Sequence, residues 1–542
     1  MILARNKAKA ISLSLAAVAL ALACAAPAVA QKKGGTLHVY APNDPPSMSI
    51  IEETSASVTG PFMAVYNNLV IFDQQNETES AETIQPELAE SWSWDSTGTK
   101  LTFKLREGVQ WHDGKPFTAK DVQCTWRMLI GKREDQKLRA NPRSIWYSKL
   151  DDVTTNGDYE VTFNLTARHP ALLSLLASGF SAVYPCHVPP EEMRKHPIGT
   201  GPFKFVDYRR GEGYELVRNP NYWKKDRPYL DAIEYDIITS RATRILALTS
   251  GQIDLSSPVD FTVGLMRDAK EQAPGLMCKL RPAGVSTNMI VNSEVPPFDN
   301  PRIREAMALA LDRDAFSKIQ YEGQAMIGGN MMPKPAGVWG IPDDKAHEFL
   351  GYGPNMDPSE KEARLKQAQK IMEELGYGPD NPLETKVSTR KLAAYTDAAV
   401  ILVDQLKQIY ISGELEPLET AQYFAAVAQG DYAVALNHTG VAVDDPDANL
   451  MESYACESPR NLTRYCRPEV EKLLHAQSSE VDKERRQQMV YEIEKLIAQE
   501  GARSIIQHTV LADCWQPYVK GYVVHNNSFY NNTRFEDVWL DK

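Results

Sequence analysis

The chain has 542 residues and a formal net charge of −12 at pH 7, because 71 acidic side chains outnumber 59 basic ones. An acidic surface repels nucleic acid and anionic membranes, so neither is expected as a partner. A chain of this length exceeds what one hydrophobic core supports, and we expect two or three domains.

The first thirty residues have the organisation of an export signal. Three basic residues precede an uncharged apolar stretch at 11–26, and the small residues at 28–30 predict cleavage before Gln31. The stretch is shorter than the roughly 20 residues that span a membrane. We therefore expect a periplasmic protein. The less favoured alternative is a lipoprotein anchored through Cys24, because Ala21 stands where a lipidation motif normally has a large aliphatic residue.

Six cysteines follow the expected cleavage site. An even number in an oxidising compartment indicates disulfides rather than redox or zinc chemistry. Cys456 and Cys466 bracket a short polar loop, and a bond between them would stabilise the fold by roughly 2–3 kcal/mol. The partners of the other four stay open: Cys124, Cys186, Cys278 and Cys514.

Strand signals come first along the chain and helix signals later. Residues 100–106 alternate apolar and polar side chains, as do 161–165, which predicts half-buried strands. Asn300-Pro301 and Asp357-Pro358 each place a capping residue before a proline, which predicts the start of a helix. Two more helices are predicted at 395–408 and 481–499, and two strands are predicted at 383–388 and 433–437. The mixture predicts an α/β fold.

Two polar motifs have structural rather than catalytic explanations. The pair His112-Asp113 precedes Gly114, and this combination is typical of a tight turn. Gly199 and Gly201 are expected to supply turn geometry with positive φ.

Several ordered blocks of sequence carry a family resemblance. They lie at 85–122, 198–203, 218–223, 246–255, 300–314 and 430–432. Together they resemble the family 5 extracellular solute-binding proteins, the peptide- and nickel-binding class of ABC importers. Within this class the likeness is greatest to the dipeptide-binding proteins, which also have cysteines at both ends of the segment that matches Cys456 to Cys466.

The resemblance implies a two-lobed periplasmic binding protein fold, of type II with three domains, a hinge and a ligand cleft between the lobes. After a signal peptide at 1–30, domain I of lobe one would comprise 31–66, 190–283 and 508–542. Domain II would be an insertion at 67–189, and domain III, lobe two, would comprise 284–507. The protein would be a monomer whose lobes close on a solute and whose closed form is read by the importer's membrane permease.

The resemblance also implies a ligand-binding set. Arg390 follows a predicted strand where dipeptide-binding relatives hold the ligand carboxylate with an arginine, and a guanidinium binds a carboxylate through two hydrogen bonds. Tyr423 stands where relatives present an aromatic ring to the cleft. His438, Thr439 and Gly440 match a strand whose backbone pairs with an extended peptide.

One position departs from the peptide-binding pattern. Relatives hold the α-amine of the peptide with an aspartate three residues before an acidic-Pro pair. Here the pair is Asp445-Pro446, and Ala442 stands at the aspartate position. Asp444 would reach the cleft only through a one-residue bulge, because alternate residues of an extended segment face opposite sides. Either Asp444 holds the amine, or the ligand lacks a free α-amine.

A secreted hydrolase is the alternative of a different class. The sequence has no G-x-S-x-G motif. His347-Glu348 begins like a zinc-peptidase helix, but Gly351 occupies the position of the second histidine. We therefore expect a binding protein that is not an enzyme, with no cofactor and no metal site.

Within the binding class, a short peptide is the leading ligand. The alternatives are an oligosaccharide, an opine-like conjugate and a nickel chelate. The ten histidines are scattered along the chain without the spacing of a metal site, which disfavours direct metal binding.

Overall fold

The computed structural model describes residues 31–257, 261–352, 356–528, 531 and 533–542. The predicted signal peptide at 1–30, with Cys24, lies outside these residues. Among the helices of the described ranges, none combines the length and the apolar character that crossing a membrane requires.

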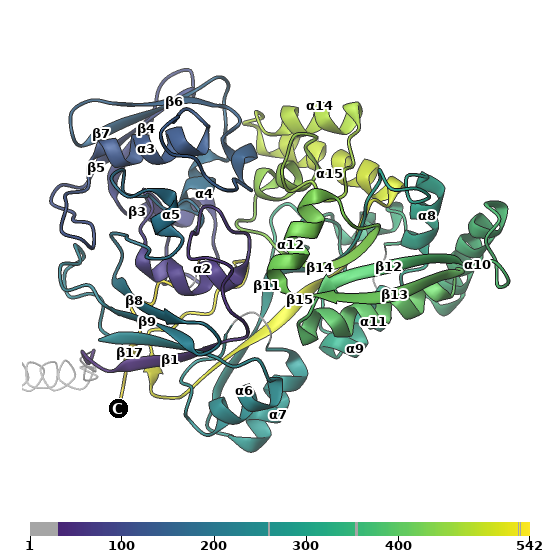
Figure 1. Ribbon diagram of the computed structural model, residues 1–542. Coiled ribbons are helices and arrows are strands. Elements are labelled where there is room, and N and C mark those ends of the chain that lie inside the picture. Colours follow the sequence, from purple (N-terminus) through teal and green to yellow (C-terminus); the bar gives the residue numbers. More distant parts are fainter. Residues whose placement is uncertain (1–30, 258–260, 353–355, 529–530, 532) are drawn as a thin grey trace, which may run out of the picture.

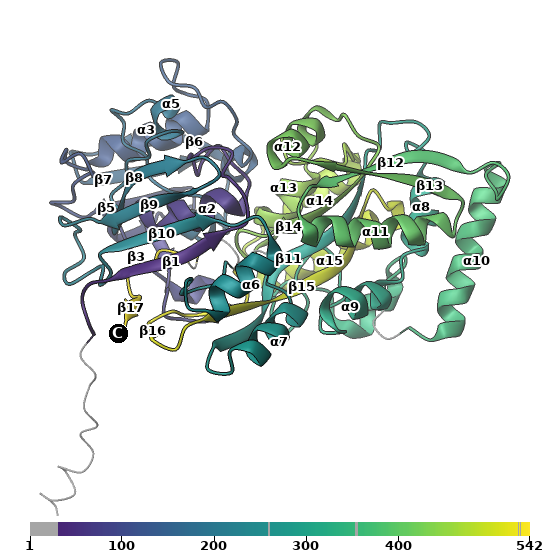
Figure 2. The ribbon, with the colours of Figure 1, turned by 60° about the horizontal axis from the view of Figure 1, so that its bottom comes forward.

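The described residues form two lobes, which lie side by side in Figures 1 and 2. We call the lobe that holds two four-stranded sheets the first lobe. The first of these sheets has the order β1 (Thr36–Ala41), β10 (Ala232–Ile237), β9 (Gly213–Arg218) and β8 (Phe203–Arg209). The other has the order β4 (Ala89–Trp94), β5 (Lys100–Leu105), β7 (Glu160–Leu165) and β6 (Leu150–Thr155).

Alternation places the apolar side of β5 and β7 against the core. Leu101, Phe103, Val161 and Phe163 are fully buried, whereas Lys100 is exposed. The predicted half-buried strands are therefore confirmed. The helices of this lobe are α2 (Ala56–Phe62), α3 (Ala119–Leu129), α4 (Leu172–Ala177), α5 (Pro190–Met193), α6 (Arg241–Thr249) and α7 (Val263–Gln272).

The second lobe is built on one mixed five-stranded sheet. Its order is β13 (Ile411–Leu418), β12 (Leu383–Arg390), β14 (Val434–Gly440), β11 (Met277–Val291) and β15 (Arg503–Trp515). Its helices are α8 (Pro301–Leu309), α9 (Arg313–Tyr321), α10 (Pro358–Glu374), α11 (Ala393–Lys407), α12 (Thr420–Gln429), α13 (Glu452–Tyr454), α14 (Pro468–Gln477) and α15 (Lys483–Glu500).

The predicted helix starts in this lobe are confirmed. The Asn300 side chain accepts a hydrogen bond from the backbone N–H of Arg302 at the start of α8, and Asp357 accepts one from Ser359 at the start of α10. These side chains satisfy backbone donors that the first turn of a helix leaves without partners.

Strands β11 and β15 continue from one lobe into the other (Figure 1). They pair antiparallel from Met277 and Trp515 to Ile290 and Arg503, whereas β14 pairs with β11 only from Val285 onward. Two short ladders complete the strands: β2 (Val70–Phe72) with β3 (Ile84–Pro86), and β16 (Val519–Lys520) with β17 (Trp539–Leu540).

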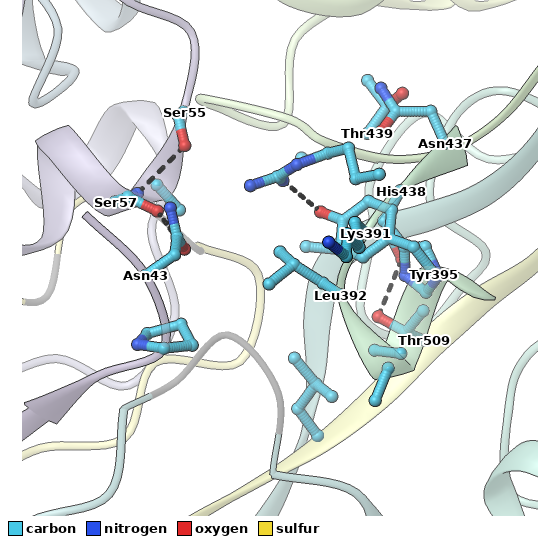
Figure 3. Close-up of a pocket in the computed structure, with 18 of the residues that line it drawn as sticks. Asn43, Ser55, Ser57, Lys391, Leu392, Tyr395, Asn437, His438, Thr439 and Thr509 are labelled. Atoms are coloured by element: carbon cyan, nitrogen blue, oxygen red, sulfur yellow. Dashed lines mark hydrogen bonds between the residues drawn. The ribbon is translucent and has the colours of Figure 1, made fainter. Parts of the chain in front are cut away.

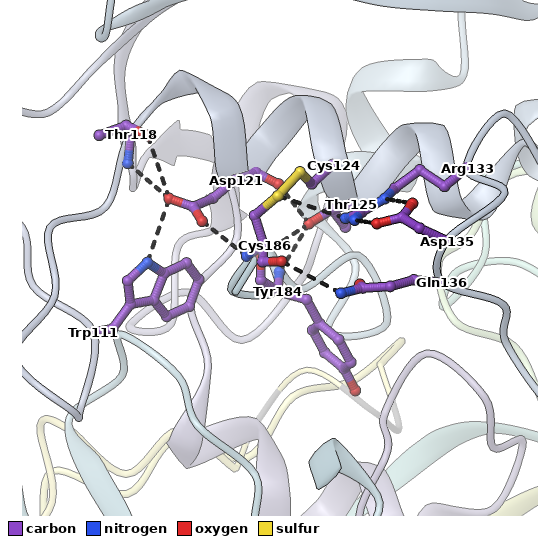
Figure 4. The surroundings of a disulfide bond; sticks show 10 residues. All are labelled: Trp111, Thr118, Asp121, Cys124, Thr125, Arg133, Asp135, Gln136, Tyr184 and Cys186. Atoms are coloured by element: carbon purple, nitrogen blue, oxygen red, sulfur yellow. Dashed lines mark hydrogen bonds and ion pairs between the residues drawn. A yellow bond between two sulfur atoms is a disulfide. The ribbon is translucent and has the colours of Figure 1, made fainter. Parts of the chain in front are cut away.

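Three disulfides account for the six cysteines. Cys456 is bonded to Cys466, the pair expected from the sequence. Cys278 is bonded to Cys514 between neighbouring positions of β11 and β15. Cys124 of α3 is bonded to Cys186, beside the Asp121 carboxylate, which accepts hydrogen bonds from the backbone N–H groups of Thr118 and Cys186, both at 2.9 Å (Figure 4).

The expectation of positive φ at Gly199 and Gly201 is wrong, since neither residue adopts it. Glycine is required there by a close backbone approach. A Cβ atom built on Gly199 would lie 1.9 Å from the carbonyl oxygen of Val65, and one on Gly201 would lie 2.5 Å from the same oxygen. The turn at Asp113-Gly114 is confirmed, with Gly114 at φ +85°.

Candidate functional site

A cavity of about 440 Å³ lies between the two lobes. Its volume falls within the roughly 300–1,000 Å³ typical of small-molecule sites. In Figure 3, Asn43, Ser55 and Ser57 line it from the first lobe, opposite Tyr395 and other residues of the second lobe. A solute in this cavity would touch both lobes.

Arg390 lines the cavity at the end of β12 and is 6% exposed. Its guanidinium donates to the Tyr395 hydroxyl at 2.7 Å and to the Thr420 hydroxyl at 3.0 and 3.2 Å. It also lies over the Tyr395 ring, 4.6 Å from the centroid. Within the described part of the chain, no carboxylate comes within 4.0 Å of it. The Arg390 guanidinium is therefore oriented by neutral hydroxyl groups, which do not neutralise its positive charge.

His438, Thr439 and Gly440 line the same cavity at the end of β14. On one side they pair with β11, where Thr287 lies opposite His438. On the other side β12 pairs with β14 only as far as Ala435. The edge of β14 beyond Ala435 is therefore without a strand partner among the described residues.

The His438 ring is neutral at physiological pH. Burial lowers the pKa of His438 to about 4. Its Nε2 atom is buried and has no hydrogen-bond partner, and the ring packs against Tyr395 with centroids 4.5 Å apart. The histidine therefore lines the cavity without contributing a charge.

Tyr423 and Asp444 lie outside the cavity, which corrects their expected placement. Tyr423 is on the buried face of α12 and packs in the core, and the following residue, Phe424, lines the cavity instead. Asp444 accepts a hydrogen bond from the backbone N–H of Val338 at 2.6 Å, and burial raises the pKa of its carboxyl to about 7. Asp444 lies beyond the end of β14 at Gly440, and it is not among the residues that line the cavity.

Two acidic residues that follow Ala442 form hydrogen bonds with basic side chains outside the cavity lining. Asp445 accepts two hydrogen bonds from the Arg486 guanidinium, at 2.7 and 2.9 Å. Asp447 accepts one from His169 of the first lobe at 2.8 Å, with both side chains 3% exposed. Ala442 itself is buried and does not line the cavity.

Basic side chains dominate the ionisable lining. Among the described residues that line the cavity, Glu419 is the one carboxylate, and five are cationic: Arg241, Arg244, Arg390, Lys391 and Arg460. Glu419 is 71% exposed and pairs with Lys391 at 3.1 Å. Arg241 and Arg460 have partners that do not line the cavity: Asp397 lies 3.3 Å from Arg241, and Glu452 lies 2.5 Å from Arg460.

The first-lobe side of the site could not be found from the sequence. Asn43, Ser55, Ser57 and Arg241 lie in loops or at helix starts. They belong to none of the sequence blocks that carry the family resemblance, so only the packing of the lobes brings them to the cavity. In the described residues, no group of three or more His, Cys, Asp or Glu side chains is placed to hold a metal ion.

Comparisons with known proteins agree with this two-lobed arrangement. Residues 83–461 match the model of "Bacterial extracellular solute-binding proteins, family 5 Middle". A probable di/tripeptide-binding protein of Pseudomonas aeruginosa is 26% identical over 90% of this chain and 93% of its own length.

Two solved structures share the fold. The periplasmic binding protein DppA of Helicobacter pylori, in complex with the peptide STSA, has a TM-score of 0.82 at 24% identity and covers 94% of this chain and 99% of its own. AgaA from A. tumefaciens R10, in complex with agropinic acid, has a TM-score of 0.81 at 21% identity with the same coverage.

Proposed function

Because the chain belongs to the bacterial extracellular solute-binding proteins of family 5, we propose that it captures a short peptide between its lobes and delivers it to the permease of an ABC importer. Members of this family are binding components of transport systems, so the chain is a binding protein and not an enzyme. The relatives that bind di- and tripeptides, and the fold shared with a peptide complex, support the peptide class.

The observation that carries the proposal is Arg390 in the interlobe cavity. It is a buried guanidinium that lines the cavity and has hydroxyl groups as its protein partners. A buried charge without an opposite charge carries a desolvation cost that a ligand carboxylate would offset. The unpaired edge of β14 beside it supports a role for the main chain in holding an extended ligand.

The hinge is proposed at the expected crossing points, near residues 284 and 508. Three observations support this placement. Gly284 has φ +61°, β11 begins to pair with β14 at Val285, and the pairing of β11 with β15 shifts register between Pro282 and Ser286. We also propose that the protein acts as a periplasmic monomer after removal of residues 1–30.

A thermal-shift screen of the mature protein tests the proposal. The compounds are di- to pentapeptides, N-acetylated peptides, oligosaccharides and nickel chelates. A ligand at 100 times its Kd stabilises the folded state by about 2.7 kcal/mol, which raises the melting temperature measurably. A shift with peptides, free or blocked, is expected. A shift with oligosaccharides or nickel chelates alone would contradict the peptide assignment.

A further inference from the structure

We propose that a small second pocket, in the first lobe, binds one compact side chain of the solute, apolar in its body and carrying a hydroxyl group. The inference rests on the proposed function, because the side chain belongs to a peptide held in the interlobe cavity. A threonine side chain has this chemistry, and a valine side chain has nearly the same shape without the hydroxyl.

The pocket has a volume of about 40 Å³ and adjoins the interlobe cavity. Three residues line both spaces: Pro42 directly after β1, and Ala56 and Ser57 at the start of α2. A cavity needs roughly 10–15 Å³ to hold one water molecule, so the pocket has room for about three heavy atoms. A side chain of a solute in the interlobe cavity would enter the pocket at this shared wall.

The floor of the pocket is one face of the sheet that contains β1, β10 and β9. Val39 lies opposite Tyr235, and Tyr235 lies opposite Tyr214, so the three side chains point to the same side of the sheet. All three line the pocket and are at most 5% exposed. The rings of Tyr214 and Tyr235 stack with their centroids 4.7 Å apart. This floor favours an apolar group, because binding removes the surface of that group from water.

Helix α2 covers the pocket with small side chains. Ala56, Ser57 and Gly60 lie on one face of the helix, and all three line the pocket. The helix is held against the sheet by Phe62, whose ring lies 5.6 Å from the ring of Tyr214 (Figure 1). A Cβ atom built on Gly60 would face open space. The missing side chain at this position therefore leaves the pocket unfilled.

Tyr235 brings an unused hydroxyl group to the pocket. Its oxygen is buried and has no hydrogen-bond partner among the described residues, although buried tyrosine hydroxyls are normally paired. The hydroxyls of Ser57, Ser256 and Tyr522, which also line the pocket, each have a protein partner at 2.9–3.0 Å. Burial raises the pKa of Tyr235 above its usual range, so the group keeps its proton and can donate it. A hydroxyl oxygen on the solute would supply the missing partner.

Isothermal titration calorimetry of the mature protein tests the inference with three sets of tripeptides. In each set one position carries Gly, Val or Thr, and the other two positions carry Ala. Because one side chain of the ligand enters the pocket, the preference should appear in one of the sets. In that set we expect the Val peptide to bind at least threefold more tightly than the Gly peptide, and the Thr peptide at least threefold more tightly than the Val peptide.

Two variants separate the apolar contribution from that of the hydroxyl. Gly60→Leu fills the pocket from α2, so the Gly, Val and Thr peptides should bind within twofold of one another. Tyr235→Phe should abolish the difference between the Thr and Val peptides and keep the preference for Val over Gly. Gly275→Leu is the matched control, at an exposed glycine outside both linings whose Cβ position also faces open space, and should keep every wild-type preference. Circular dichroism melting of each variant checks that it folds.

The outcomes separate the inference from the proposed function. The inference is refuted, and the peptide-binding function stands, if the Val and Thr peptides bind no more tightly than the Gly peptide in all three sets. It is also refuted if the Thr and Val peptides bind equally, or if their preference persists in Gly60→Leu. If none of the tripeptides and none of the peptides in the wider screen binds, the proposed function itself fails.

Discussion

The contact between His169 and Asp447 should control the closed form of the protein. His169 follows β7 in the first lobe, and Asp447 follows β14 in the second. The pair is supported by Lys149, which donates to Ser478 at 2.7 Å, while Ser478 donates to Asp447 at 2.6 Å. Burial opposes ionisation of Asp447, yet the hydrogen bond and charge of His169 outweigh it and hold the pKa of Asp447 well below its usual range.

Asp447→Asn removes the charge and keeps the shape of the side chain. A hydrogen bond to a charged group contributes roughly 1.5–3 kcal/mol. The contact joins the two lobes, and separating the lobes would break it, so most of this loss should appear as weaker solute binding. At 1.4 kcal/mol per factor of ten, we expect an increase in Kd of about 10- to 100-fold.

The assay is calorimetry with the best peptide from the screen, combined with small-angle X-ray scattering of the liganded protein. A double-mutant cycle with His169→Gln isolates the pair. Asp152→Asn is the matched control, since Asp152 pairs with Arg127 at 2.8 Å within the first lobe and should leave Kd unchanged. An Asp447→Asn protein that folds, binds with wild-type Kd and closes to the wild-type radius of gyration would refute the role of this contact.

Two further predictions concern stability. Gly199→Ala should destabilise by about 1–3 kcal/mol or more in chemical denaturation, because the added Cβ meets the Val65 carbonyl. Gly60→Ala, in α2 with open space around the Cβ position, should be neutral or stabilising by up to about 1 kcal/mol, and equal losses at both sites would contradict the packing argument. Burial raises the pKa of Glu494 from 4.5 to about 7, so its contribution to stability is fully present below its unfolded pKa and is lost as pH rises through about 7. In the Glu494→Gln variant, the melting temperature should therefore fall less as the pH rises through about 7. If the variant and the wild type show the same dependence of melting temperature on pH, another group causes the fall.

Local patterns predicted the secondary structure well because they act over a few residues. The alternation in β5, the cap at Asn300 and the turn at Gly114 each depend on neighbours along the chain. The Cys278–Cys514 bond could not be predicted in this way. It joins residues 236 apart that become neighbours only when β11 pairs with β15.

The candidate site was predicted in part. Arg390 and the segment from His438 to Gly440 line the cavity because each ends a strand at the same edge of the second-lobe sheet. Tyr423 was misplaced by one position, since one residue on a helix turns the side chain by about 100° and Phe424 faces the cavity instead. Asp444 was misplaced because its carboxylate bonds to the backbone of Val338, a contact between distant parts of the chain that local sequence does not reveal.

The most direct test of the central claim is mass spectrometry of the solute that the protein carries when it is purified from the periplasm under non-denaturing conditions. The solute is released by denaturation and identified from its fragmentation pattern. We predict a short peptide. A released oligosaccharide or nickel chelate, with no peptide, would contradict the account.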